Sequence, residues 1–592
     1  MSDESGKFVH VANLSDFDSV PCITAQAGGH TLALFKYGDS IYAIDNRCPH
    51  MGFPLSQGSV TDGILTCYWH YARFDLATGG TFDQFADDVP TFPVELRDGG
   101  VWVDLSPQGD RSDYYRTRLN DGLERDIPLV IAKAVIHLLE AGADPVESFR
   151  IGLAYGTTYR GDGWGQGLTI LTCMQNLLPY LRPDERARAL YHGLAAVTRD
   201  TTGEAPRFVV SPLPGEAADP VTLKRWFRQF VEVRDSEGAE RCLVSASRAG
   251  AGRADLADML FAAATDHRYI QVGHPLDFTN KALEALDHTG WEDPERILTS
   301  LVGGIAFAQR MEESNAWRHP VDLVAILAGA FERLPDSLEG AGDGWVWEDS
   351  LAMVDTLLGD DPHAIADALL GALAAGCTPV DLAQAVSYAA AMRIARFHTS
   401  NEFTDWDTAL HTFTFANAVE MGLRRLHAGG EDRRYTDLLR GVFDAAMSVY
   451  LDRFLNVPAT RIPVPNGSPD GAALSELPRL LDRQQQVNPA AQAVADYLGN
   501  ETGVDELLAE LGRLLLREDR DFHTIQTVDA ALNQFRLLAG KPEAVHARGE
   551  RSRTILIAAV RYLAAHSPTV RAQGQTYQIA LRLARGERLY EG

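Results

Sequence analysis

The chain has 592 residues, of which 45% are hydrophobic and 23% charged, a composition typical of packed globular domains. Its formal net charge of −27 at pH 7 repels the phosphates of nucleic acids and anionic lipids, so we expect neither as a partner. The acidic N-terminus lacks a secretion signal, and no stretch is apolar enough to span a membrane. We therefore expect a cytoplasmic protein.

Residues 1–105 contain short runs of alternating apolar and polar residues, separated by turn-forming residues. This pattern predicts a small all-β domain. Two predicted loops carry one cysteine and one histidine each. They contribute Cys48 with His50, and Cys67 with His70.

Two thiolates and two imidazoles could bind either a structural zinc ion or a [2Fe-2S] cluster. Zinc fingers pair Cys with Cys and His with His, whereas each loop here supplies one of each. One iron could then take both thiolates and the other both imidazoles. With the residues 51–52, 73–75 and 89–93, this arrangement resembles the Rieske ferredoxin family over residues 1–105. The resemblance implies that Cys48, His50, Cys67 and His70 bind a [2Fe-2S] cluster.

The same resemblance carries an expectation about the reduction potential. High-potential Rieske proteins have an extra cysteine in each loop and a serine just past the second histidine, whereas Tyr71 and Ala72 follow here. Fewer hydrogen bonds to sulfur imply a potential toward the lower end of the roughly −150 to +300 mV Rieske range. Such a cluster suits an electron feeder for an oxygenase. The acidic domain fits an external reductase or ferredoxin as electron donor.

Residues 106–125 are polar and rich in turn-forming residues, and we interpret them as a linker. From residue 126 to 592 apolar residues recur every three or four positions, which predicts an all-α domain. Three similar segments, 140–147, 248–255 and 374–381, each place a glycine between two helical patterns. We expect that glycine to end one helix before the next begins.

A second recurring motif places a histidine six residues before an asparagine or aspartate. It begins at His274, His411 and His523, and Ile170 takes the histidine's place in the first copy. We infer about four helical repeat units in the all-α domain. Their approximate bounds are 126–204, 224–317, 363–457 and 489–567.

Equivalent positions in a repeat array could bring His274, His411 and His523 to one cavity. Neutral imidazoles suit iron, and His267 and His398 are secondary candidates for the same site. Two alternatives stay open: a scaffold in which the histidines only form hydrogen bonds, and a metal-free pocket in which they act as acid or base. The segments around His274 and His411 also resemble the His-bearing helices of questin-oxidase-like proteins.

The sequence therefore predicts a multidomain protein with a small all-β Rieske domain followed by a large all-α domain. We expect an oxidoreductase, monooxygenase-like, whose [2Fe-2S] cluster passes electrons to a His-lined site in the helical domain. That site would act on a small organic substrate and would hold an additional iron. The alternative is a non-enzymatic Rieske electron carrier or redox sensor, fused to a helical scaffold that binds a protein partner.

Overall fold

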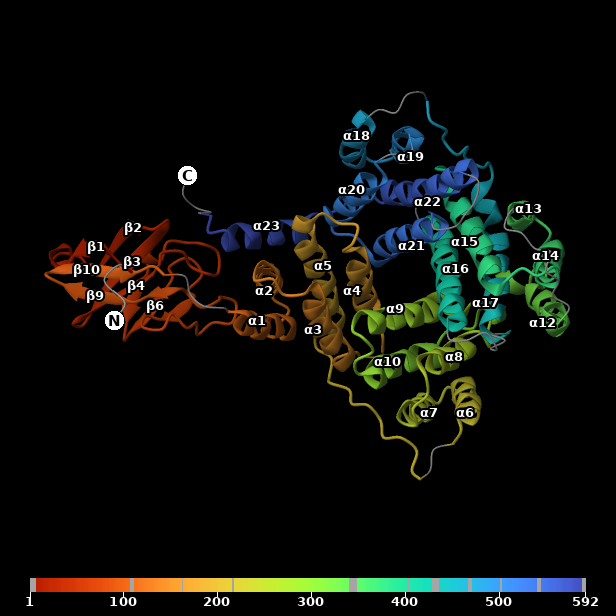
Figure 1. Ribbon diagram of the computed structural model, residues 1–592, viewed down its shortest axis with the longest axis horizontal. Coiled ribbons are helices and arrows are strands. Elements are labelled where there is room, and N and C mark those ends of the chain that lie inside the picture. Colours follow the sequence, from red (N-terminus) through yellow and green to blue (C-terminus); the bar gives the residue numbers. More distant parts are fainter. Residues whose placement is uncertain are drawn as a thin grey trace. The chain divides into compact units, whose positions relative to one another are not determined.

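The computed structural model describes residues 7–106, 111–161, 163–215, 218–339, 349–402, 404–428, 436–466, 471–500, 503–539 and 545–587. A β-rich N-terminal part is followed by helices, which confirms the predicted fold class (Figure 1). The chain divides into two compact units. The first comprises Met1–Ile151 with Ala572–Gly592, and the second comprises Gly152–Arg571.

The first unit contains three small antiparallel sheets, with strand orders β1-β10-β9, β2-β3-β4-β8 and β5-β6-β7. Residues of β3 alternate between its two faces, as they must in a pleated strand. Leu32 and Leu34 enter one hydrophobic core, and Ala33 and Phe35 enter a second core. The strands are β1 (Phe8–Asn13), β2 (Cys22–Ala27), β3 (His30–Tyr37), β4 (Ser40–Asp45), β5 (Ser59–Thr61), β6 (Ile64–Thr66), β7 (Arg73–Asp75), β8 (Thr91–Phe92), β9 (Val94–Arg97) and β10 (Gly100–Asp104).

Three helices belong to the same unit as the strands. They are α1 (Ser112–Glu124), α2 (Pro128–Glu140) and α23 (Ala572–Ala584), and α2 packs against both others. The segment interpreted as a linker thus contains a helix. Arg118, in the middle of α1, is only 5% exposed, and the β-domain residue Asp87 accepts a hydrogen bond from it. Because Arg118 occupies a buried position, the segment lacks the apolar repeat that would have predicted this helix.

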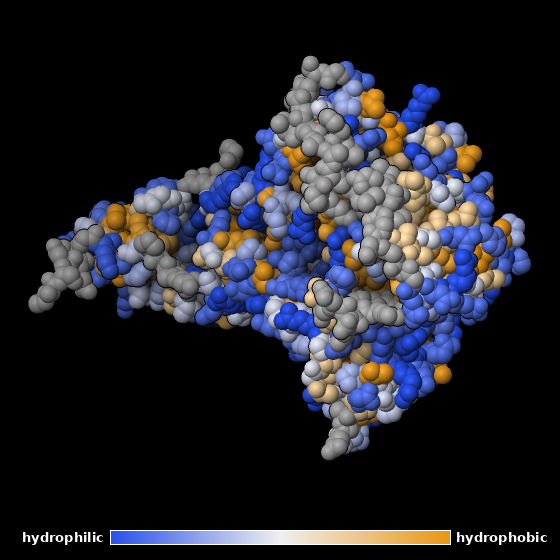
Figure 2. All heavy atoms as spheres, turned by 45° about the vertical axis from the view of Figure 1, so that its right-hand side comes forward, coloured by the Kyte–Doolittle hydropathy of each residue, from blue (hydrophilic) through white to orange (hydrophobic). Residues whose placement is uncertain are grey.

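The second unit consists of helices, of which α3 begins in the first unit. Hydrophilic residues cover much of the face seen in Figure 2, with hydrophobic residues in small groups. Among the described helices, none combines the length and the apolarity needed to cross a membrane. The helices are α3 (Pro145–Thr158), α4 (Gln166–Leu177), α5 (Pro183–Thr201), α6 (Pro220–Glu232), α7 (Ser236–Arg248), α8 (Arg253–Ala264), α9 (His274–His288), α10 (Pro294–Ala306), α11 (Asn315–Arg318), α12 (Leu323–Glu339), α13 (Asp349–Leu357), α14 (Pro362–Ala374), α15 (Pro379–Ala395), α16 (Asp405–His427), α17 (Thr436–Leu451), α18 (Gly471–Leu481), α19 (Val487–Tyr497), α20 (Val504–Leu516), α21 (Phe522–Ala539) and α22 (Val545–Ala565).

Four helices of the second unit, α4, α9, α16 and α21, pack in a closed cycle. Helix α4 contacts α9, α9 contacts α16, α16 contacts α21, and α21 contacts α4 (Figure 1). Outside the cycle, α5 packs on α4, α10 on α9, α15 and α17 on α16, and α22 on α21. Each of the four carries one copy of the recurring motif, so equivalent motif positions face a common interior.

The three predicted helix junctions lie between α2 and α3, α7 and α8, and α14 and α15. Gly142, Gly250 and Gly376 stand there with φ of 87°, 83° and 100°. This left-handed conformation costs glycine nothing but strains other residues, so glycine ends each of these helices.

Candidate metal centres

Cys48 and Cys67 lie in two loops of the same construction. The Cys48 amide donates to the Phe53 carbonyl at 2.8 Å, and the Cys67 amide donates to the Ala72 carbonyl at 2.9 Å. Four residues after each cysteine the backbone is left-handed, with φ of 80° at Gly52 and 61° at Tyr71. These bonds fix both cysteines in the core, where they are 2% and 1% exposed.

The four predicted ligands converge at the tips of these loops. The rings of His50 and His70 lie 4.8 Å apart, centroid to centroid. A hydrogen bond from the Cys48 thiol, with help from backbone amides, lowers the pKa of Cys67 to about 6. Burial, His70 and Lys133 lower the pKa of His50 to about 4. A thiolate and a neutral imidazole are the forms that bind metal.

Buried, unsatisfied ligand atoms test whether the site fits a [2Fe-2S] cluster. His50 Nδ1 is buried and has no hydrogen-bond partner, which is costly unless a metal takes its lone pair. With the two buried thiols and the second imidazole, the donor set is two sulfurs and two nitrogens. That set fits the cluster and defines a one-electron transfer domain of the Rieske type.

Comparison with known proteins agrees with this assignment. Residues 7–93 match the family model of the Rieske [2Fe-2S] domain. The ferredoxin component of the naphthalene 1,2-dioxygenase system of Pseudomonas putida is 31% identical over 101 residues, which are 17% of this chain and 97% of that protein. The chain therefore belongs to the Rieske [2Fe-2S] domain family.

Two further relatives extend the comparison. Apoptosis-inducing factor 3 of Homo sapiens is 26% identical over 174 residues, and the matched region is 29% of this chain and 27% of that protein. The ferredoxin of carbazole 1,9a-dioxygenase from Nocardioides aromaticivorans IC177 is 26% identical in structural alignment, with a TM-score of 0.16. That alignment covers 16% of this chain and 96% of the ferredoxin.

The second unit brings His274, His411 and His523 together. They come from α9, α16 and α21, three helices of the central cycle, while Ile170 on α4 stays in the core. Ring centroids lie 4.7 Å apart for His274 and His411 and 4.8 Å apart for His411 and His523. The Nε2 atoms of His411 and His523 are separated by 3.1 Å.

This cluster has the properties of a metal site. Burial, and then the neighbouring histidines, lower the pKa of His274 to about 4 and that of His411 to about 3, so both are neutral at pH 7. One nitrogen of each of the three rings lies within 4.8 Å of the others, so a single ion could bind all three histidines. Three nitrogen ligands leave coordination positions open for another molecule.

A strained turn positions His274 at the start of α9. Tyr269, Gln271 and Val272 are left-handed, with φ of 42°, 43° and 50°, and Gly273 follows with φ of 93°. Each such non-glycine residue costs of order 1–3 kcal/mol, and strain of this kind clusters at functional sites. The sequence analysis missed this turn because Gln and Val carry no turn signature.

Two cavities reach the histidines, one beside His274 and one beside His411. The first measures about 310 Å³ and the second about 450 Å³. The second is mainly apolar, and Tyr269, Trp317 and Phe454 are among its lining residues. A volume of this size suits a small organic molecule.

Asp452 is a buried acid in the wall of the larger cavity, and the sequence analysis did not single it out. Burial raises its pKa to about 7, although Thr412 and Arg393 act to lower it. Its Oδ2 atom has no hydrogen-bond partner. A carboxyl that titrates near neutral pH beside a cavity can donate or accept a proton there.

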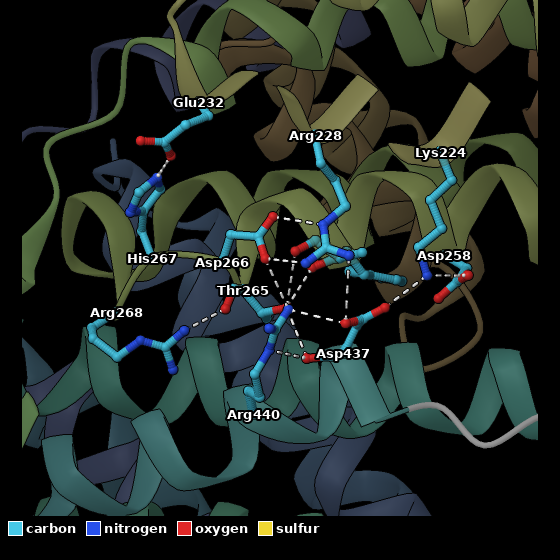
Figure 3. Close-up of polar contacts among 12 residues, drawn as sticks. Lys224, Arg228, Glu232, Asp258, Thr265, Asp266, His267, Arg268, Asp437 and Arg440 are labelled. Carbon is cyan, nitrogen blue, oxygen red and sulfur yellow. Dashed lines mark hydrogen bonds and ion pairs between the residues drawn. The ribbon is translucent and has the colours of Figure 1, made fainter. Parts of the chain in front are cut away.

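The secondary candidates His267 and His398 lie outside this cluster. His267 Nε2 lies 2.8 Å from Glu232 and its Nδ1 lies 2.6 Å from Glu312. Figure 3 shows His267 pointing to Glu232, beside a group of ion pairs. His398 Nδ1 lies 2.6 Å from the Ser400 hydroxyl. Both histidines are therefore engaged in local polar contacts.

Proposed function

We propose that the chain is an oxidoreductase in which the Rieske unit supplies electrons to a metal bound by His274, His411 and His523. The observation that carries this proposal is the meeting of three imidazoles from three separate helices, of which those of His274 and His411 are neutral at pH 7. If these three positions served core packing alone, leucine would fill them as well as histidine. An iron at this site, with open positions, would support oxygenase chemistry of the monooxygenase type.

The Rieske residues have a limited task in this scheme. The bound cluster supplies single electrons. Cys48, Cys67, His50 and His70 hold it at the loop tips, where His70 is exposed enough to meet a redox partner. The relatives named as ferredoxin components of dioxygenase systems support an electron-feeding role. In this chain donor and acceptor share one polypeptide, which raises their effective concentration.

The larger cavity next to His411 is the proposed substrate site. Its wall is mainly aromatic and aliphatic, which favours an apolar organic substrate. Asp452 is the buried acid of this wall, and we assign it the transfer of a proton to or from the substrate. Tyr269 belongs to the strained turn, which links the shape of this cavity to the position of His274.

An external reductase or ferredoxin would be the electron source, because no flavin or nicotinamide motif occurs in the sequence. The six cysteines all lie in the described residues and none forms a disulfide bond, which a reducing compartment such as the cytoplasm favours.

Reoxidation of the reduced full-length protein by oxygen tests the proposal. The protein is reduced with dithionite without air and mixed with air-saturated buffer, and the visible absorption of the cluster is followed. If electrons leave through the histidine site, His411→Ala slows reoxidation at least ~10-fold, about 1.4 kcal/mol in barrier. His398→Ala is the matched control, because the His398 imidazole lies outside the cluster and bonds to the exposed Ser400 in its own loop.

Equal reoxidation rates in the wild type and both variants would contradict the proposal. They would favour the alternative function, in which the Rieske unit carries or senses electrons and the helical unit is a protein-binding scaffold. A slow rate in both variants would also contradict it, because His398 lies outside the proposed site.

A further inference from the structure

A buried lysine stands behind one of the cluster loops. Lys133, on α2, is 4% exposed, and its ammonium donates to the Pro49 carbonyl at 2.8 Å. Pro49 lies between Cys48 and His50, so the ammonium sits directly behind the first ligand loop. Lys133 lies outside residues 7–93, which match the family model. It is thus an addition to the Rieske domain.

Asp87 holds Lys133 in this place. The two form an ion pair, and Asp87 also accepts a hydrogen bond from Arg118 Nε at 3.0 Å. Burial favours the neutral form of Asp87, but the attraction of Lys133 and Arg118 outweighs this effect, so the pKa of the carboxyl is lowered. Asp87 is therefore ionised at neutral pH, and its carboxylate faces the Lys133 ammonium.

The first two helices also fix the neighbouring β-domain segment 84–88. Arg118 donates to the carbonyls of Gln84 and Ala86, each at 2.9 Å, and the Asp88 amide donates to the Tyr114 hydroxyl at 2.8 Å. The ring of Phe85, in the same segment, lies 4.9 Å from that of His50. Helices α1 and α2 thus hold the protein wall around His50.

The Lys133 ammonium bonds directly to the ligand loop, through the Pro49 carbonyl, whereas Asp87 reaches that loop through the ammonium. The nearer charge dominates the field at the cluster, because the Coulomb energy falls with distance. Reduction of the cluster adds one negative charge. A buried positive charge stabilises that product, because a low-dielectric interior screens it little. The reduction potential must therefore rise when the lysine is in place.

We propose that Lys133 is a positioning residue that raises the reduction potential of the cluster, through its buried charge and its bond to Pro49. The potential expected from the loop residues alone lies low in the Rieske range, since Tyr71 and Ala72 replace the hydrogen-bonding residues. The charge of Lys133 on helix α2 compensates for part of the reduction potential that these missing hydrogen bonds would have added. The inference concerns the Rieske unit only and holds whatever the helical unit does.

The test is the reduction potential of the full-length protein and of charge variants, measured by a spectroscopic redox titration. Lys133→Met removes the charge at similar volume, and we expect the potential to fall by about 59 mV, a tenfold change in a one-electron equilibrium. Asp87→Asn removes the opposing charge, and we expect the potential to rise. Arg125→Met is the matched control, because it removes an exposed positive charge from the end of α1 and leaves the potential unchanged.

Opposite shifts separate an electrostatic role from a structural one. If the ion pair only held the loop in place, Lys133→Met and Asp87→Asn would shift the reduction potential in the same direction, because either change breaks that pair. Such a result would overturn the proposal. An unchanged potential in either variant with an intact cluster spectrum would also overturn it. If Lys133→Met does not hold its cluster, the rise expected for Asp87→Asn decides alone.

Discussion

Individual side chains at both candidate centres are fixed by their surroundings before any ligand binds. In each Rieske loop a backbone hydrogen bond holds the cysteine in the core. In the helical unit, buried polar residues follow the histidines along the central helices, such as Asp277 one turn after His274. The four proposed Rieske ligands could be singled out from the sequence, because short spacings between Cys and His define the motif. The role of Asp452 could not, because only the fold shows that this acid is buried.

Replacing a cluster ligand should remove the cluster without unfolding the chain. For Cys48→Ser we expect loss of the visible absorption, because one of two thiolate ligands is gone, while the far-ultraviolet circular dichroism stays helical. Cys22→Ser is the control, since Cys22 is a half-buried residue of β2 that is not one of the four proposed ligands. A normal cluster spectrum in Cys48→Ser would be incompatible with the ligand assignment.

Asp277 should make stability depend on pH. Burial raises its pKa from 3.8 to about 8, and neither carboxyl oxygen has a hydrogen-bond partner. Between these two pH values the folded protein binds a proton that the unfolded chain has lost, so stability falls as pH rises. Asp277→Asn removes the titrating group and with it this fall in stability. The variant should therefore be stabilised over the wild type by more than ~1 kcal/mol more at pH 8 than at pH 5.

Denaturant unfolding at pH 5 and pH 8 measures this difference. The exposed Asp355→Asn on α13 is the control and should show no difference between the two pH values. A stabilisation by Asp277→Asn that is the same at both would mean that this carboxyl is not held protonated.

Among the described elements, the turn before α9 departs from regular geometry over several residues, while the three helix junctions follow their sequence signals. The junction glycines could be predicted, because a glycine between two helical patterns commonly ends the first helix. The left-handed conformation of Gln271 and Val272 could not be predicted, because neither residue type favours it. Helix α1 was missed for a related reason: its buried Arg118 looks like a surface residue in the sequence.

A side chain at Gly273 should disturb this turn. In Gly273→Ala the new Cβ would lie 2.9 Å from Phe415 Cβ, and the backbone φ of 93° is unfavourable for alanine. We expect a loss of ~1–3 kcal/mol in stability and weaker metal binding by the histidines. The control is Gly371→Ala on α14, where the Cβ meets open space and alanine should stabilise the helix slightly. Equal thermal unfolding temperatures for the wild type and Gly273→Ala would show that the turn is not strained.

At the scale of the whole molecule, residues far apart in sequence define both units. The C-terminal helix α23 belongs to the Rieske unit and packs on α2, which no local sequence pattern indicated. The order of a β-domain followed by helices was predictable from periodicity. The closed cycle of α4, α9, α16 and α21 was suggested only by the recurring motif, since contacts between distant helices leave no other trace in a single sequence.

The central claim, a metal held by three histidines in a chain with a Rieske cluster, is tested most directly by the iron content of the full-length protein. We expect more than the two irons of the [2Fe-2S] cluster per chain. In the combined variant His274→Ala, His411→Ala and His523→Ala, the excess should disappear while the visible spectrum of the cluster stays unchanged. Two irons per chain in both proteins, with no other metal present, would contradict the account.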